Sequence, residues 1–151
     1  MNPNYVPDEL YAEFVANFPM ICVDLVVEHD GGVILARRDI EPAKGRWFWP
    51  GGRLFKGEPL KQSVHRVAEQ ELGIDVEIVD QLGVQAHFWE TSDAVGGPSR
   101  HTVNVVYRVM PVQDDLSLQL DDQHTEYRIL TNPEPPLHEY VHLYIDEYDL
   151  L

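Results

Sequence analysis

The chain has a single cysteine, Cys22, and this scarcity excludes an internal disulfide. Cys22 lies within the apolar run MICVDLVV, where a buried thiol is expected and a reactive one is not. One unpaired thiol also fits a reducing compartment. We therefore expect this residue to contribute packing and no redox chemistry.

The chain also lacks a long apolar segment. No run of 18 or more residues is apolar, which argues against a membrane-spanning helix. The first 20 residues carry Asp8, Glu9 and Glu13, without the basic start and apolar centre of a secretory signal. These features predict a soluble, cytoplasmic protein that has no membrane partner.

Basic residues are scarce as well. There are 11 lysines and arginines against 26 acids, which gives a formal net charge of −15, and only three of the bases are lysines. Such a surface repels nucleic acid and acidic lipid, so neither is an expected partner. An anionic substrate would need a local patch of cations or a metal ion. The same balance suits a protein adapted to concentrated salt, and it also suits an ordinary acidic cytosolic protein.

The length and the patterning predict one compact domain over residues 1–151, without repeats, low-complexity segments or linkers. Apolar spacing and turn residues predict a helix over 8–17, a hairpin of strands 20–28 and 33–38, a helix from Pro59 to Gly73, strands at 76–84, 86–89, 103–110 and 127–130, and a helical tail. This order predicts an α+β fold, an α/β/α sandwich around a mixed β-sheet. We interpret the long polar loop before residue 103 as functional.

Residues 52–74 carry glycine, acidic and arginine residues at a characteristic spacing. They follow the pattern G-x5-E-x7-R-E-U-x-E-E-x-G-U, where U is a bulky aliphatic residue. The positions in register are Gly52, Glu58, Arg66, Glu71, Gly73 and Ile74. Through these positions the chain resembles the Nudix hydrolases. The resemblance implies the same sandwich fold and hydrolysis of a nucleoside diphosphate derivative.

Three motif positions depart from the pattern. Val67 and Gln70 stand where this family usually has glutamates, and Ala68 occupies the first aliphatic position. A magnesium ion that bridges two phosphates prefers hard oxygen ligands, and Glu71 is the surviving helix acid best placed to be one. Attack at phosphorus relies on several helix carboxylates, so we expect that route to be crippled in this chain.

The departures resemble a subgroup, the GDP-mannose mannosyl hydrolases, which lack these two acids and attack the sugar carbon. The similarity extends to PAKGRWFWPGGRLFKGEPL, to the helix ending ELG and to DDQHTEYRILT. It implies a homodimer with a magnesium site, open also to manganese, formed by the Gly51 carbonyl, Glu71 and Gln123. It also implies that His124 is the general base, because histidine titrates near neutrality and can deprotonate water. Taken alone, a histidine within DDQH would instead be a solvated loop residue.

Arginines can neutralise the charge that grows on a departing diphosphate. Arg38 and Arg53 match arginines of the subgroup, and we predict that they hold the diphosphate during catalysis. Arg66 also matches, and two roles are open for it. It could bind substrate, or it could pair with a neighbouring carboxylate to steady the helix. Glu58 is expected to support the adjoining loop.

Three residues on predicted strands are candidates for substrate binding. Asp24 lies in an apolar strand, where a carboxylate needs a partner. The resemblance implies that Asp24 assists substrate binding, and a buried structural hydrogen bond is the alternative. His87 and Trp89 share one strand face and match a histidine and an aromatic residue of the subgroup. They are predicted to contact the sugar or the base, with packing as the alternative for Trp89.

The determinants of base and sugar depart from the subgroup. There, an acidic and an aromatic residue from the N-terminal segment of the partner subunit read guanine, and the matching positions here are Leu10 and Tyr11. Tyr11 is therefore a candidate for base binding, while the acid is missing. Thr102 replaces a tyrosine that approaches the phosphates.

Together these features predict a magnesium-dependent Nudix hydrolase that acts on a nucleoside diphosphate sugar. GDP-mannose would yield GDP and mannose with inversion at the anomeric carbon. One alternative is a conventional Nudix pyrophosphatase that cleaves ADP-ribose or another nucleoside diphosphate derivative at phosphorus. The other is a catalytically silent Nudix domain that binds nucleotide sugars, and the presence of Glu71, Gln123 and His124 argues against it.

Overall fold

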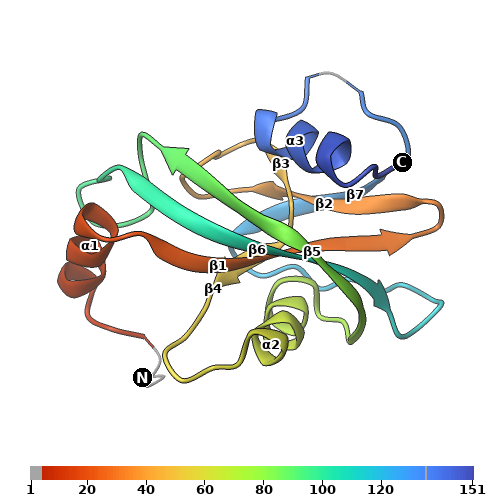
Figure 1. The fold of residues 1–151 in the computed structure, drawn as a ribbon, viewed down its shortest axis with the longest axis horizontal. Helices are drawn as coiled ribbons and strands as arrows, with labels where there is room; N and C mark the ends of the chain where they lie inside the picture. The colour runs from red at the N-terminus through yellow and green to blue at the C-terminus, as the bar shows by residue number, and fades with distance from the viewer. Residues whose placement is uncertain (1–4, 135) are drawn as a thin grey trace.

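The computed structural model describes residues 5–134 and 136–151, and Figure 1 shows its elements. In chain order they are α1 (Asp8–Asn17), β1 (Met20–His29), β2 (Gly32–Arg38), β3 (Trp47–Phe48), β4 (Gly51–Arg53), α2 (Leu60–Leu72), β5 (Val76–Trp89), β6 (Arg100–Pro111), β7 (His124–Leu130) and α3 (Glu139–Glu147). None of the described helices is both long and apolar enough to cross a membrane.

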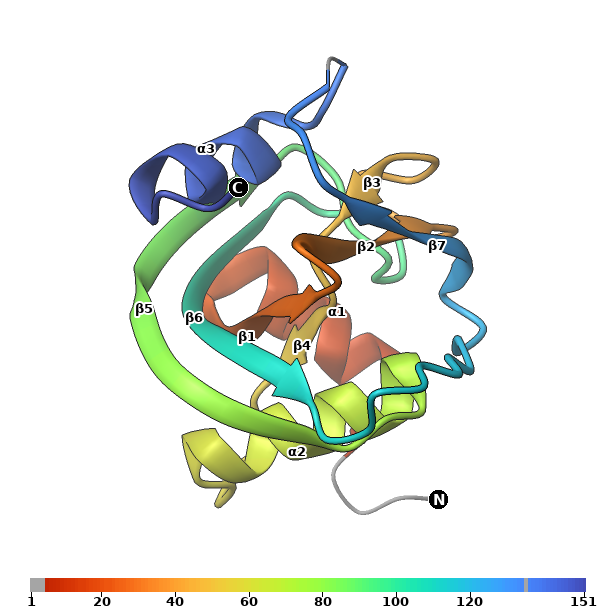
Figure 2. The same cartoon turned by 90° about the vertical axis from the view of Figure 1, so that its right-hand side faces the viewer.

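The strands of the described residues form one seven-stranded mixed sheet around β1. The strand order is β3-β2-β1-β6-β5, with β4 paired to β1 and β7 paired to β2. β1 and β6 run parallel, whereas the other pairs are antiparallel. Figures 1 and 2 show α2 and α3 on opposite sides of the sheet. The architecture is the α+β sandwich that the element order predicts.

Alternate residues of β1 supply two separate cores, one under each helix. Val23 packs with Val67 of α2 in the first core. Val26 packs with Tyr144 of α3 in the second. Neighbouring side chains of a strand point to opposite faces, so one strand can serve both cores. The same alternation places Asp24 on the α3 side, where it meets Tyr144.

Helix α2 follows Pro59 and ends at Gly73, as the motif predicts. Gly73 has a φ of 68° and its N–H donates to the Glu69 carbonyl at 3.0 Å. Glycine adopts this left-handed conformation without strain, which stops the helix there. The buried face of α2 carries apolar side chains along most of its length and Glu71 near its end. The fold therefore delivers one motif carboxylate to the protein interior.

The strand boundaries differ from the sequence prediction in several places, and β6 begins three residues before the predicted strand 103–110. Separate strands at 76–84 and 86–89 are wrong, because β5 runs through both. Register shifts between residues 78 and 80 and between 81 and 83 absorb the irregular positions while the pairing with β6 continues. β7 begins at His124 and not at residue 127, since a register shift in β2 allows His124 to pair with Arg38.

Candidate active site

A cavity of about 760 Å³ gathers side chains from both halves of the chain. Ten of the eleven predicted site residues line it, namely Tyr11, Asp24, Arg38, Gly51, Arg53, Arg66, Glu71, His87, Trp89 and Gln123. The eleventh, His124, is not on the lining and contacts the lining residue Asp121. The folded chain thus brings the predicted residues together around one cavity.

The centre of the site is a cluster of Glu71, Asp121 and His124. One ligand atom from each lies within 4.8 Å of the other two. His124 Nδ1 is 2.6 Å from Asp121 Oδ1, and the Gly51 N–H donates to Glu71 Oε2 at 2.7 Å. Only 1% of the His124 side chain is exposed, so the solvated-loop alternative is wrong. Gln123 also lines the cavity, and its backbone carbonyl accepts from the Asp39 N–H at 2.7 Å.

The cluster fits a divalent cation by its chemistry. The pKa of Glu71 is raised to about 7, chiefly by burial and also by the Asp121 carboxylate, against the opposing effects of His124, the Gly51 N–H and Arg38. Two carboxylates in a poorly solvated place repel each other, and a bound cation offsets that repulsion. Carboxylate oxygens are also the ligands that magnesium and manganese prefer. Glu71 and Asp121 are therefore suited to hold such an ion.

The two departures on α2 remove acids from the cavity. Val67 is 1% exposed and belongs to the apolar core. The Gln70 side chain accepts a hydrogen bond from Arg66 Nη1 at 3.0 Å. Among the motif positions of α2, only Glu71 presents a carboxylate to the site.

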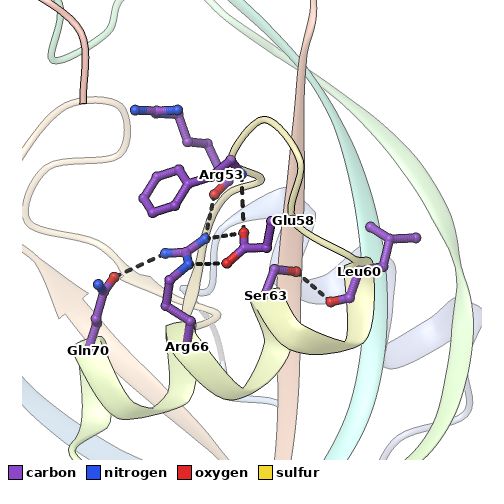
Figure 3. Close-up of polar contacts among 7 residues, drawn as sticks. Arg53, Glu58, Leu60, Ser63, Arg66 and Gln70 are labelled. Carbon is purple, nitrogen blue, oxygen red and sulfur yellow. Dashed lines mark hydrogen bonds and ion pairs between the residues drawn. The ribbon is translucent and has the colours of Figure 1, made fainter. Parts of the chain in front are cut away.

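Arg66 forms an ion pair with Glu58 (Figure 3). This is the pairing expected if Arg66 steadies the helix. Its Nε donates to Glu58 Oε2 at 2.6 Å and its Nη2 to Glu58 Oε1 at 2.9 Å. Nη2 also donates to the Arg53 carbonyl at 2.9 Å. Glu58 in turn accepts from the Phe55 N–H at 3.1 Å, and the Arg66 pairing lowers its pKa. These bonds tie α2 to the loop that precedes it, and they occupy most of the donors that Arg66 could offer a substrate.

Arg38 and Arg53 both line the cavity and bring positive charge to it. Arg38 Nε donates to the Pro42 carbonyl at 2.6 Å, which fixes its side chain. Burial lowers the pKa of Arg38, and the Glu71 charge acts against that effect. The Arg53 guanidinium lies over the Phe55 ring, 4.8 Å from its centroid. On a molecule with so few basic residues, these two guanidinium groups supply local positive charge of the kind that an anionic substrate needs.

Asp24 has the buried partners that its position demands. Its Oδ2 accepts from the Tyr144 hydroxyl at 2.5 Å and from Asn104 Nδ2 at 3.0 Å. Asn104 is itself oriented by Thr102, whose hydroxyl donates to Asn104 Oδ1 at 2.6 Å. Burial raises the pKa of Asp24 to about 6, while the two hydrogen bonds lower it. Asp24 is thus a buried structural acceptor that also borders the cavity.

His87 and Trp89 belong to an aromatic wall. The His87 ring stacks on Tyr140 with a centroid distance of 3.9 Å, and its Nε2 lies 3.0 Å from the Tyr144 hydroxyl. Burial lowers the pKa of His87 to about 4, so this ring is neutral at physiological pH. Trp89 meets Phe48 edge to face at 5.7 Å. Both residues pack in the wall and also line the cavity.

Five residues of the site were missed from the sequence: Asp93, Arg100, Asn104, Asp121 and Tyr144. Asp121 lies within the DDQH segment, and Asp93 lies in the loop interpreted as functional, so both had a local signal. The other three have none, because a polar residue in a strand or a helix does not reveal which tertiary partner it meets. Arg100 and Tyr11 meet within one chain, with Arg100 Nη1 donating to the Tyr11 hydroxyl at 3.1 Å.

Gly51 is held against β1 and has no room for a side chain. A Cβ at this position would fall on Asp24 Oδ1 and lie 2.7 Å from the Val23 carbonyl oxygen. We expect Gly51→Ala to lower the free energy of unfolding by about 1–3 kcal/mol, measured by urea denaturation. Gly52→Ala is the matched control, because its Cβ would meet only the Val67 side chain, at 3.2 Å. Equal losses in the two variants would contradict this account.

Comparison with known families identifies the motif and the fold together. The model of the NUDIX domain matches residues 19–148. The chain belongs to the Nudix family. The matched range includes β1 to β7, α2 and the cluster of Glu71, Asp121 and His124, so the candidate site lies in the Nudix domain.

Relatives of this Nudix protein include a close match and a distant one. The low-salt glycan biosynthesis protein Agl8 of Haloferax volcanii is 44% identical over 144 residues, which cover 95% of this chain and 91% of that protein. The ADP-ribose pyrophosphatase of Methanocaldococcus jannaschii is 27% identical over 114 residues, covering 76% of this chain and 64% of that protein.

Solved Nudix structures share the fold. The MutT Nudix hydrolase from Burkholderia pseudomallei has a TM-score of 0.68 at 26% identity, over 85% of this chain and 97% of that one. The MutT protein from Methanosarcina mazei has a TM-score of 0.70 at 22% identity, over 87% of this chain and 94% of that one. The Nudix sandwich predicted from the sequence is confirmed, and the protein is a Nudix hydrolase by family.

Proposed function

We propose that this Nudix domain, taken as residues 1–151, hydrolyses a nucleoside diphosphate sugar, with GDP-mannose as the first candidate. Water attacks the anomeric carbon, and the products are GDP and free mannose. The reaction requires magnesium, which manganese can replace. The proposal includes the homodimer that the resemblance implies.

The observation that carries this proposal is the location of the acids and the base. Helix α2 presents one carboxylate to the cavity, Glu71, where attack at phosphorus would call on several. The candidate base, His124, comes from β7 and is held by Asp121. A carboxylate can only accept a hydrogen bond, so Nδ1 carries the proton and Nε2 has the free lone pair. A single oriented histidine suits deprotonation of water at a carbon centre.

The remaining side chains divide the work around the reacting bond. Arg38 and Arg53 neutralise the diphosphate as it departs, which makes it a better leaving group. A divalent cation held by Glu71 and Asp121, with Gly51 and Gln123 as further candidate ligands, would supply additional positive charge to that diphosphate. That charge would help the diphosphate to leave, and the cation would not have to activate the attacking water.

Two wall residues and one acid would position the sugar. The aromatic wall of His87 and Trp89 offers flat apolar faces, and Asp24 offers a buried acceptor to a hydroxyl group. The glycan biosynthesis named for the Haloferax volcanii relative accords with an activated sugar as substrate.

A conventional pyrophosphatase is the second candidate, and one feature of the structure favours it. Asp121 brings a second carboxylate to Glu71 from outside α2, so a two-acid metal site at phosphorus is chemically accessible. The Methanocaldococcus jannaschii relative is named as an ADP-ribose pyrophosphatase. This route would convert GDP-mannose to GMP and mannose phosphate.

Isotope labelling tests the proposal directly. Turnover of GDP-mannose with magnesium in oxygen-18 water is expected to place the label in free mannose, followed by mass spectrometry of the products. Label in GDP, GMP or mannose phosphate would overturn attack at carbon. ADP-ribose and other nucleotide sugars assayed in parallel identify the preferred substrate, and no turnover of any of them would support the silent binding domain.

A further inference from the structure

Beside Arg53, three polar side chains of the cavity contact one another. They are Tyr11 of α1, Asp93 of the loop that precedes β6, and Arg100 at the start of β6. The Tyr11 hydroxyl donates to Asp93 Oδ1 at 3.1 Å, and Arg100 Nη1 lies 3.4 Å from the same oxygen. Within the described residues, the hydrogen bonds of Asp93 all reach Oδ1. Asp93 Oδ2 is therefore available to a ligand.

The loop presents Asp93 by burying its neighbours. Ser92 is 5% exposed and Ala94 is 6% exposed, and the Gly97 N–H donates to the Ala94 carbonyl at 2.8 Å. The Asp93 side chain is 31% exposed, whereas the Arg100 side chain is 13% exposed. The loop is thus anchored on both sides of one acid, and the acid faces the cavity with a fixed arginine next to it.

Aromatic rings lie next to these three residues. The Arg53 guanidinium is 5.6 Å from the Tyr5 ring centroid and 6.0 Å from that of Tyr11. With Phe55, which lies under the same guanidinium, these rings line one end of the cavity. Flat aromatic and guanidinium faces suit stacking with a flat heterocycle. This end of the cavity is therefore better suited to a nucleobase than to a sugar.

We infer that Asp93 and Arg100 read the edge of a guanine base within this end of the cavity. The inference rests on the proposed function, because it takes a nucleoside diphosphate sugar as the ligand. Guanine presents two neighbouring N–H donors and an adjacent carbonyl oxygen. The Asp93 carboxylate accepts from the donors, and the Arg100 guanidinium donates to the oxygen. Adenine presents one amino donor beside a ring nitrogen acceptor, so it leaves part of the carboxylate unmatched.

This site differs from the one that the resemblance implies. There the acid comes from the N-terminal segment of a partner subunit, at the position of Leu10, which here is an apolar side chain 42% exposed. Here the acid is Asp93, and it contacts Tyr11 of its own chain. The base site is therefore complete within one chain.

Binding of GDP and ADP to the magnesium-loaded protein tests the inference. We expect the wild type to prefer GDP in isothermal titration calorimetry. Asp93→Asn should reduce the GDP-to-ADP affinity ratio by about 10- to 100-fold, because its amide N–H₂ opposes the guanine donors and charged hydrogen bonds are among the stronger ones. Affinity for ADP should change little. Asp146→Asn, which removes an exposed acid from α3, is the charge-matched control and should keep the wild-type ratio.

Each remaining outcome overturns the assignment. A wild type that binds GDP and ADP equally has no guanine site. Equal weakening of both nucleotides by Asp93→Asn would show that the acid supports the loop and does not read the base. Since these titrations involve no turnover, they are independent of the isotope experiment: attack at phosphorus would leave the base preference intact, and loss of the base preference would leave the site of attack unchanged.

Discussion

Replacing His124 with asparagine is expected to lower the turnover number for GDP-mannose by about 10²- to 10⁴-fold, while the Kd for GDP stays close to the wild-type value. The loss is the usual contribution of a positioned general base. Asparagine keeps a polar group next to Asp121 but cannot take a proton from water. Steady-state kinetics and calorimetry with GDP, both at saturating magnesium, measure the two quantities separately.

Two structural features of His124 motivate this prediction. Its ring is 2.6 Å from Asp121 and is shielded from bulk solvent, so its orientation is fixed. One of its ring nitrogens lies within 4.8 Å of a Glu71 carboxylate oxygen, in the cluster that could hold a cation. His65→Asn is the matched control, since His65 is exposed on α2 and should be dispensable. Equal losses of turnover and GDP affinity in His124→Asn would count against a base and in favour of a binding role.

The fold was predictable because local signals and the apolar pattern agree over most of the chain. Helix α2 has an apolar face and a proline and a glycine at its two ends, so its bounds could be read directly from the sequence. Strand β5 was divided incorrectly, because the register shifts near residues 79 and 82 interrupt the alternation on which strand prediction depends. The short strands β3 and β4 carry no periodic signal of their own and exist through pairing with β2 and β1.

The candidate site was predictable as a set of residues but not as a network. The motif indicates that Glu71 and Arg66 lie near a site. It does not show that Arg66 donates two hydrogen bonds to Glu58. The partners of Asp24 could not be found from the sequence, because Tyr144 lies 120 positions away and reaches it only through the packing of α3. Asp24 could be expected to have a partner, since an unpaired buried carboxylate is costly, but the partner itself is set by tertiary structure.

Glu71→Gln is expected to abolish magnesium-dependent turnover and yet to stabilise the metal-free protein at alkaline pH. Burial raises the pKa of Glu71 from 4.5 to about 7, so on folding this carboxyl group binds protons more tightly than it does in the unfolded chain. Below about pH 4.5 the carboxyl group is protonated in both the folded and the unfolded state, so its burial does not lower the free energy of unfolding. As the pH rises from about 4.5 to 7, the folded wild type loses stability, by up to about 3 kcal/mol in total. Glutamine has no such charge to bury, so the advantage of the variant grows over this interval and is constant above it.

Magnesium should reverse that order of stability. An ion that binds only the folded wild type stabilises it by about 4.1 kcal/mol at a concentration of 1,000 times Kd, which exceeds the advantage of the metal-free variant. The variant has lost one of the two clustered carboxylates, so its stability should respond little. Urea denaturation between pH 4 and pH 8, with magnesium and with a chelator, measures all four cases. Glu69→Gln provides the control, because it removes an exposed acid from the same helix. If Glu71→Gln proved less stable at every pH, or gained as much from magnesium as the wild type, Glu71 would be a structural acceptor for the Gly51 N–H and not a metal ligand.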